Sequence, residues 1–279
     1  MSADNDKLTF VIDKAFDGVR EKSNLTLNDN HYSLIANPVL ENDKVIGAVV
    51  LIIDVTESVK REQLRREFTS NVSHELKTPL TSISGFAEIM KNGGTPNAVV
   101  TDFSTSIYDE AQRLISLVND IIKISELDEK DVQAESEDVD LYQLSADIIN
   151  RLKPVADKRN ISLNLIGEST IVSGAEKILD EMIYNLCDNA IKYNVDNGTV
   201  DIILSESNHH IKLTVRDNGI GIPQSEQERI FERFYRVDKS HSKAIGGTGL
   251  GLSIVKHAAI YHNCLLYTSP SPRDPKTSR

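Results

Sequence analysis

The sequence contains no tryptophan and only two cysteines, Cys187 and Cys264, among its 279 residues. Two cysteines exclude a disulfide framework and fit a reducing compartment. The sequence also lacks an apolar run of about 20 residues, which a membrane-spanning helix would need. Its longest apolar run, Val45 to Ile53, has the length and composition of a strand. Since the N-terminal residues do not resemble a signal peptide either, we expect this chain to be cytoplasmic.

Clusters of basic residues are missing as well. The chain has 31 Lys and Arg against 42 Asp and Glu, a net charge of −11. Without a basic track to follow a phosphate backbone, nucleic acid is not an expected partner. The length allows about two domains, and the predicted fold class is multidomain α+β.

Residues 1–56 are predicted to be rich in β-structure. The strand at Val45–Ile53 follows an expected turn at Asn42-Asp43, and residues 31–36 are expected to be its neighbour. The exit Ile53-Asp-Val-Thr-Glu57 resembles the end of a PAS sensor domain. The resemblance implies that about half of such a domain is present and that the chain begins inside it. A short unrelated β segment is the alternative.

Two long helices are predicted next. Apolar residues recur at steps of three and four through 57–91 and again through 98–127, with a turn rich in Gly, Pro and Asn at 92–97. Such a pair forms an antiparallel hairpin. One hairpin cannot bury both of its apolar stripes, whereas two can do so as a four-helix bundle, so we expect a homodimer.

The first helix carries the most informative motif, Ser73-His-Glu-Leu-Lys-Thr-Pro-Leu80. His74 lies two residues from the apolar Val72 and Leu76, about 200° around the helix, so its imidazole points away from the apolar stripe. A neutral imidazole is a nucleophile at neutral pH, and the adjacent Glu75 can fix its tautomer. Thr78 lies one turn further on nearly the same face.

Residues 68–83 resemble the phosphoacceptor box of two-component sensor histidine kinases. This resemblance implies that His74 is phosphorylated and that Glu75 is its acid/base partner. It also implies that Thr78 positions water when such a kinase dephosphorylates its partner.

An acidic linker is predicted at 128–139 and an α/β domain at 140–263, with helices at 141–158, 175–193 and 252–262 and strands at 161–166, 199–205 and 210–216. On the second of these helices Asn185, Asn189 and Lys192 share a face. Amide oxygens can bind Mg²⁺ or its waters, and lysine can neutralise phosphate. This face resembles the N box of the histidine-kinase and Hsp90-like (GHKL) ATPases, with Asn185 and Asn189 as the magnesium ligands.

Three further segments of this domain resemble boxes of the same superfamily. Asp217-Asn-Gly-Ile-Gly-Ile-Pro223 resembles the G1 box, in which Asp217 would contact adenine. Ile230-Phe-Glu-Arg-Phe-Tyr-Arg236 resembles the F box, which anchors a mobile lid. Each of its two arginines, Arg233 and Arg236, would either contact phosphate or lie in solvent. Gly246-Gly-Thr-Gly-Leu-Gly-Leu252 resembles the G2 box, where backbone N–H groups and a helix N-terminus bind an anion.

The order of the boxes after a histidine box is more specific than any one of them. It implies an ATP-binding domain with Mg²⁺ whose expected contacts are Asn185, Asn189, Lys192, Tyr193, Asp217, Gly219, Gly221, Ile222, Phe231, Arg236, Gly247, Thr248, Gly249, Leu250 and Gly251. Related ATPases have a glutamate that activates water where this chain has Asn185. Asparagine cannot take a proton, which suits transfer to His74 rather than hydrolysis.

The resemblance implies a kinase that phosphorylates its own His74 and then an aspartate of a response regulator. It also implies a full-length protein that is anchored in the membrane upstream, and the phosphate-limitation sensors are the most similar subfamily.

The pattern departs from the family in two places. Residues 264–279 have three prolines and no strand alternation where the family continues its sheet, so this tail is interpreted as non-native and the domain as incomplete. Gly174-Ala175 stands where the family has Gly-Asp. Two alternatives therefore stay open: a GHKL-type ATPase or protein-serine kinase, and a catalytically inactive scaffold.

Overall fold

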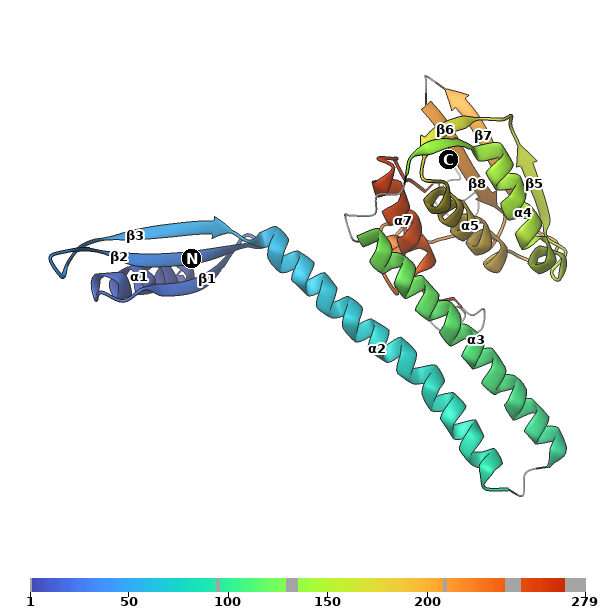
Figure 1. Ribbon diagram of the computed structural model, residues 1–279, viewed down its shortest axis with the longest axis horizontal. Coiled ribbons are helices and arrows are strands. Elements are labelled where there is room, and N and C mark those ends of the chain that lie inside the picture. Colours follow the sequence, from blue (N-terminus) through green and yellow to red (C-terminus); the bar gives the residue numbers. More distant parts are fainter. Residues whose placement is uncertain (1, 94–95, 129–134, 208–209, 239–246, 269–279) are drawn as a thin grey trace. The chain divides into compact units, whose positions relative to one another are not determined.

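The computed structural model describes residues 2–93, 96–128, 135–207, 210–238 and 247–268 (Figure 1). The chain divides into two compact units, Met1–Glu75 and Leu76–Arg279, which meet within one long helix. Each unit is described by itself below.

The N-terminal unit is an antiparallel sheet covered by one helix. Its elements are α1 (Ser2–Phe16), β1 (Glu21–Leu27), β2 (Asn30–Glu41) and β3 (Lys44–Asp54), with the strand order β1-β2-β3. The two central residues of the β2–β3 turn, Asn42 and Asp43, have φ of 49° and 62°, the left-handed conformation that a tight hairpin needs. The predicted β3, its neighbour and this turn are thus confirmed, whereas α1 and β1 were not predicted.

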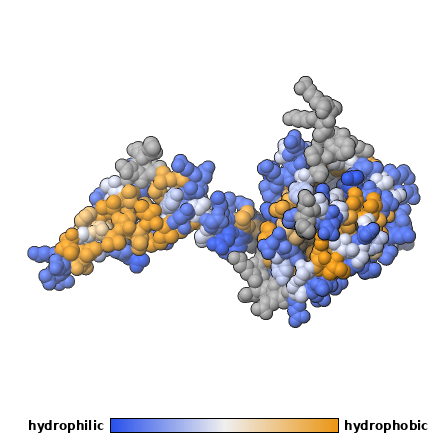
Figure 2. All heavy atoms as spheres, turned by 90° about the horizontal axis from the view of Figure 1, so that it is seen from above, coloured by the Kyte–Doolittle hydropathy of each residue, from blue (hydrophilic) through white to orange (hydrophobic). Residues whose placement is uncertain are grey.

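Helix α1 covers only one face of this sheet. Val11 and Ala15 of α1 pack with Leu34 and Ala36 of β2, and all four are fully buried. Apolar side chains gather on the surface of the same unit, as Figure 2 shows. They include Val49, Leu51 and Ile53, which alternate along β3 and are about half exposed. The half-PAS assignment stays a prediction.

A hydrogen-bonded junction joins β3 to the next helix, α2 (Thr56–Lys91). The Asp54 carboxylate accepts the Thr56 N–H at 2.9 Å, and the Thr56 hydroxyl accepts the His31 N–H at 2.8 Å. The hydrogen bonds from Thr56 lower the pKa of Asp54. The Asp-x-Thr pattern noted in the sequence therefore satisfies the first N–H of α2 and ties the helix to the neighbouring strand.

The helical hairpin of the second unit follows the prediction closely. Helix α2 runs to Lys91 and α3 spans Asn97–Asp128, each bound within a residue of the predicted one. Near the turn the rings of Phe86 and Phe103 lie 5.0 Å apart. None of the described helices is long and apolar enough to cross a bilayer.

The hairpin leaves apolar side chains uncovered. Leu80 of α2 is 54% exposed and Ile122 of α3 is 49% exposed. This exposure is what the predicted four-helix bundle would remove.

The rest of the second unit is an α/β sandwich. Its elements are β4 (Glu137–Asp140), α4 (Leu141–Asp157), β5 (Ser162–Ile166), β6 (Ile171–Gly174), α5 (Glu176–Lys192), β7 (Thr199–Ser207), β8 (His210–Asp217), η1 (Arg229–Phe231) and α7 (Gly251–Tyr261). The main sheet has the order β5-β7-β8, with β5 parallel and β8 antiparallel to β7 (Figure 1). Helices α4 and α5 cover it, and Ile148, Ile183 and Val200 are fully buried between them.

The acidic segment 128–139 is not a linker throughout. Its last residues enter β4, which pairs with β6. Asp140 ends that strand and caps α4, because its side chain accepts the backbone N–H groups of Tyr142 and Gln143. Residues 129–134 lie outside the described part.

Arg159 caps the C-terminal end of α5 with its side chain. Its guanidinium donates to the carbonyls of Ile191, Lys192 and Asn194 at 3.0, 3.1 and 2.6 Å and to the Asp196 carboxylate at 2.9 Å. A helix leaves its last carbonyls without intrahelical partners, and a cation there also suits the helix dipole.

Replacing Arg159 by alanine should therefore lower the free energy of unfolding by about 2 kcal/mol, the typical value for charged hydrogen bonds. Urea denaturation of the variant measures this loss. The matched control is Lys153→Ala, an exposed position shortly before it, which should change stability by less than about 0.5 kcal/mol. Equal midpoints for the two variants would contradict the capping role.

Candidate functional site

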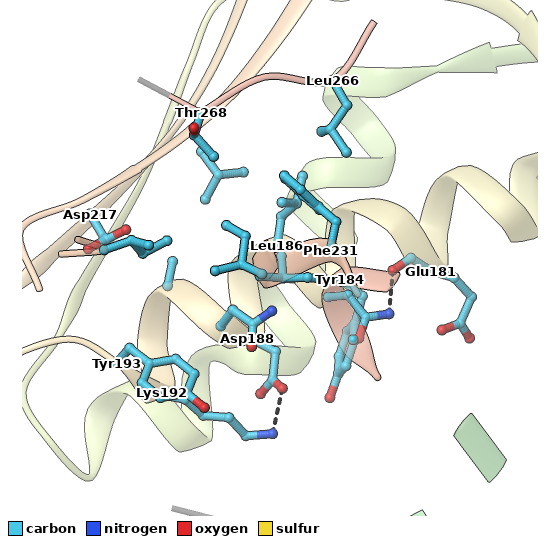
Figure 3. A pocket seen from close by; sticks show the side chains of 18 of the residues that line it. Glu181, Tyr184, Leu186, Asp188, Lys192, Tyr193, Asp217, Phe231, Leu266 and Thr268 are labelled. Atoms are coloured by element: carbon cyan, nitrogen blue, oxygen red, sulfur yellow. Dashed lines mark hydrogen bonds and ion pairs between the residues drawn. The ribbon is translucent and has the colours of Figure 1, made fainter. Parts of the chain in front are cut away.

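One large pocket brings together segments that are far apart in the sequence (Figure 3). Its walls come from α5, from the loop after β8, from the segment around η1 and from the glycine-rich turn before α7. Every predicted contact in the α/β domain except Leu250 lines it: Asn185, Asn189, Lys192, Tyr193, Asp217, Gly219, Gly221, Ile222, Phe231, Arg236, Gly247, Thr248, Gly249 and Gly251.

Helix α5 presents the two predicted magnesium ligands to the glycine-rich turn. The Asn185 amide donates to the Glu181 carbonyl at 2.8 Å, which directs its Oδ1 away from that carbonyl. A Cβ placed on Gly251 would lie 2.8 Å from this Oδ1 and 3.6 Å from the Asn189 amide nitrogen. An amide oxygen therefore faces the turn where an anion would bind, a donor that suits Mg²⁺ alongside phosphate oxygens.

Lys192, at the end of α5, forms a close ion pair. Its Nζ lies 2.6 Å from Oδ2 of Asp188, one turn earlier (Figure 3). Burial disfavours the charged form of Lys192, but the charge and hydrogen bond of Asp188 outweigh it and raise the pKa of the lysine. The ammonium is thus fully charged at neutral pH and stands in the pocket wall.

The loop after β8 packs against the C-terminal end of α5. One oxygen of Asp217 accepts the Gly219 N–H at 2.9 Å, and the Ile220 N–H donates to the Tyr193 carbonyl at 3.1 Å. A Cβ on Gly219 would lie 2.3 Å from that carbonyl, so only glycine fits here. These contacts fix Asp217 at the strand end with its carboxylate exposed in the pocket.

The segment around η1 is bonded to the glycine-rich turn. Arg236 donates to the Thr248 carbonyl at 2.9 Å, and the Phe234 N–H donates to the Gly249 carbonyl at 2.8 Å. Arg233 instead contacts His257 of α7 at 2.9 Å. Residues 239–246, where the sequence predicts a lid and the first G2 glycine, lie outside the described residues.

Leu250 is the predicted contact that the structure places elsewhere. Its side chain is fully buried at the start of α7, and it does not line the pocket. Thr248, two residues earlier, accepts the Leu250 N–H on its hydroxyl at 3.3 Å. Leu250 therefore anchors the turn to the core, while Thr248, Gly249 and Gly251 line the pocket.

The predicted phosphoacceptor residues lie on α2. His74 is exposed there, and Glu75 and Thr78 are half-buried. Pro79 lies within the helix without ending it. The outward direction predicted for the imidazole agrees with its exposure.

Helix α3 also lines the pocket, which was not predicted from the sequence. Asp120 and Lys123 of α3 line it, and the Thr248 hydroxyl donates to Asp120 Oδ2 at 2.8 Å. Burial raises the pKa of Asp120 against the lowering effects of Thr248, Lys123 and Lys192. No sequence motif marks these residues, because the contact joins positions more than 100 residues apart.

At the departure Gly174-Ala175, the start of α5 is bonded to His262, which follows α7. Ala175 stands at the N-cap of α5 without a side chain that can cap the helix. The His262 ring instead accepts the Ala175 N–H on Nε2 at 3.0 Å, and its Nδ1 donates to the Ala258 carbonyl at 3.0 Å. The His262 ring thus joins the start of α5 to the end of α7.

The described start of the tail, residues 264–268, forms no strand, as expected, and lines the pocket. Thr268 donates to the Gln227 side chain at 3.2 Å, and Lys212 lies 5.8 Å from the Tyr267 ring. The assignment of this tail as non-native stays a prediction.

Known protein families match both the helical hairpin and the α/β domain of this chain. Residues 64–130 match the family model "His Kinase A (phospho-acceptor) domain", and residues 174–276 match "Histidine kinase-, DNA gyrase B-, and HSP90-like ATPase". The chain is 35% identical over 248 residues to the sensor histidine kinase WalK of Bacillus subtilis and 38% identical over 226 residues to the sensor-like histidine kinase SenX3 of Mycolicibacterium smegmatis.

These matches cover 88% and 81% of the chain but 40% and 59% of the two relatives, so the chain spans about half of their length. Among solved structures, full-length ShkA in complex with AMPPNP is similar over 72% of this chain and 41% of that one, with a TM-score of 0.51 and 25% identity. Both family models, in the order that the sequence predicts, and the two relatives place the chain among the sensor histidine kinases of two-component systems.

Proposed function

We propose that this chain is the kinase core of its parent protein, which transfers the γ-phosphoryl group of ATP to His74. The observation that carries the proposal is the convergence of all four nucleotide boxes on one pocket, in a chain whose phosphoacceptor motif presents an exposed histidine. The binding of AMPPNP by the similar ShkA supports ATP as the nucleotide.

In this proposal each box has its own task. The Asp217 carboxylate accepts the adenine amino group, and the glycine-rich turn binds the phosphates through its N–H groups at the start of α7. Lys192 neutralises phosphate charge. The amide oxygens of Asn185 and Asn189 would hold Mg²⁺, which would supply positive charge that offsets the phosphate charge.

The reaction forms one bond and breaks one bond. A ring nitrogen of His74 attacks the γ-phosphorus in line, the bond to the β,γ-bridging oxygen breaks, and ADP leaves. Glu75 accepts the other ring N–H and stabilises the imidazolium that develops. Asn185 cannot act as a base toward water, which favours transfer to the histidine over hydrolysis.

The partners follow from the family. The phosphoryl group passes from His74 to an aspartate of a response regulator that docks on the hairpin. Thr78 positions water when the kinase dephosphorylates that regulator. The uncovered apolar residues of the hairpin support a homodimer with a four-helix bundle. We further propose that this core is cytoplasmic and that its parent is membrane-anchored.

Incubation of the chain with γ-labelled ATP tests the function and separates its alternatives. A label that is lost in acid and kept in alkali identifies phosphohistidine and supports the proposal. Acid-stable label would instead identify a serine kinase, and phosphate release without label an ATPase. Intact dimers that neither bind nucleotide nor take up label would identify a scaffold.

Asp217 provides a test of the adenine contact. In Asp217→Asn the Oδ1 that accepts the Gly219 N–H is kept, so the loop should fold unchanged, while the acceptor for the adenine amino group becomes a donor. We expect ATP affinity to fall by about 10- to 100-fold, the range for a lost hydrogen bond to a charged group.

Calorimetric titration with ATP and GTP measures this change. Asp201→Asn, on the adjacent strand β7 and outside the pocket, is the control and should bind ATP as the wild type does. An unchanged preference for ATP over GTP in Asp217→Asn would contradict the assignment.

A further inference from the structure

Helix α3 of the hairpin forms one wall of the nucleotide pocket. It contributes Gln112, Ile115, Ser116, Asn119, Asp120 and Lys123 to the lining. One of them, Asp120, is bonded to a nucleotide box, since it accepts the Thr248 hydroxyl at 2.8 Å. Thr248 belongs to the turn that the proposed function assigns to phosphate, so a carboxylate of the hairpin stands at the phosphate site.

The same face of α3 holds the α/β domain at two more points. Lys123 Nζ lies 2.7 Å and 2.8 Å from the two carboxylate oxygens of Glu181 on α5. Leu127 packs against Ile178 and Ala258, of α5 and α7. Asp120, Lys123 and Leu127 follow each other at helical spacing, so they form one continuous docking stripe. Figure 1 shows α3 running beside α7 in this unit.

The charges in this contact oppose a bound triphosphate. Asp120 and Lys192 interact electrostatically, and this attraction contributes to the raised pKa of the lysine. The Thr248 hydroxyl therefore donates to the Asp120 carboxylate, and the charge of this carboxylate partly balances that of Lys192. A triphosphate at the same turn would bring several negative charges close to Asp120, in a half-buried place where such repulsion is poorly screened.

We propose that Asp120 is a nucleotide-sensitive latch that holds the α/β domain on α3 when the pocket is empty and releases it when a nucleoside triphosphate with its divalent cation binds. The proposal rests on the proposed function, since it needs the triphosphate at the glycine-rich turn. Because coupling between two equilibria is reciprocal, the docked contact must weaken nucleotide binding by the same factor by which nucleotide weakens docking. Asp120 acts as a positioning residue for the domain that delivers the phosphoryl group.

Asp120→Asn separates charge from hydrogen bonding. The amide oxygen still accepts the Thr248 hydroxyl and the side chain keeps its size, but the negative charge is gone. We expect the full chain with this substitution to bind Mg²⁺–AMPPNP about tenfold more tightly by calorimetry, equal to about 1.4 kcal/mol. Asp109→Asn, an exposed carboxylate on the same helix and outside the pocket, should leave the affinity within twofold of wild type.

A distance measurement reports docking directly. Spin labels at Asp109→Cys on α3 and Lys256→Cys on α7, both exposed positions, are introduced into a chain with Cys264→Ser. The remaining Cys187 is buried, and burial raises its thiol pKa to about 12, so it should not react. Without nucleotide the distance distribution should be narrow, and Mg²⁺–AMPPNP should broaden it and shift it to longer values. Asp120→Asn keeps the hydrogen bond to Thr248 but lacks the repelling charge, so its distance distribution should stay narrow when Mg²⁺–AMPPNP binds.

The outcomes distinguish failure of the latch from failure of the proposed function. If wild type binds AMPPNP but Asp120→Asn binds it no more tightly, the latch is wrong and the kinase proposal stands. The same holds if nucleotide binds to the wild type but leaves its spin-label distance unchanged. If neither chain binds nucleotide, both are wrong. Binding by Asp120→Asn alone would support the latch strongly. AMPPNP cannot transfer its terminal phosphoryl group, so none of these results depends on catalysis.

Discussion

His74→Gln should remove all phosphohistidine from the protein while leaving its fold and its nucleotide affinity unchanged. The glutamine amide is not a nucleophile, and no other residue of the phosphoacceptor motif is a histidine. Because His74 is exposed on α2, the replacement should not disturb a buried core. The measurement is the acid-labile label from γ-labelled ATP, with calorimetric ATP binding and thermal unfolding on the same samples.

Two further variants make this result specific. His31→Gln changes a histidine of β2 in the N-terminal sheet and should label as wild type does. Glu75→Gln keeps the nucleophile and loses the adjacent carboxylate, so labelling should slow by about 100-fold or more without being abolished. Acid-labile label that persists in His74→Gln would show that another histidine is the acceptor, and the assignment of this motif would be wrong.

The predictions from sequence succeeded where local chemistry decides the structure. The bounds of α2 and α3 were predicted within one residue, since apolar periodicity and the breaker-rich turn between them are both local signals. The Asn42-Asp43 hairpin was predicted for the same reason. Most nucleotide contacts were assigned by resemblance, and the fold brings all but Leu250 to one pocket.

The features that were missed depend on tertiary context. Helix α1 has a modest apolar face, and its Val11 and Ala15 are buried only because β2 offers Leu34 and Ala36. Leu250 stands in a nucleotide motif, yet its apolar side chain turns into the core. The hydrogen bond between Asp120 and Thr248 joins a helix of one family domain to a loop of the other, and no pattern within either segment encodes it.

The G2 turn illustrates how a motif and its packing complete each other. The sequence supplies three glycines within five described residues, 247–251, but does not say which of them the fold cannot replace. In the structure Gly249 has φ of +75°, a conformation that costs a side chain about 1 kcal/mol or more. It also lies against the backbone of Phe234, so conformation and contact restrict the same position.

Gly249→Ala should accordingly reduce ATP affinity by more than 100-fold. A Cβ at this position would lie 2.9 Å from the Phe234 carbonyl carbon, closer than real Cβ contacts, and within tight contact of Phe234 Cα at 3.0 Å and Arg236 Nε at 3.2 Å. Phe234 is bonded to Gly249 through its N–H, and Arg236 holds the Thr248 carbonyl, so the turn cannot yield without moving the N–H groups that face the phosphates. Calorimetry with Mg²⁺–AMPPNP measures the loss.

Gly47→Ala, in β3 with no atom within 4 Å of the new Cβ, is the matched control and should bind as wild type does. An affinity for Gly249→Ala within tenfold of wild type would mean that the phosphates do not depend on this turn, and the assignment of the glycine-rich segment as the anion site would be wrong.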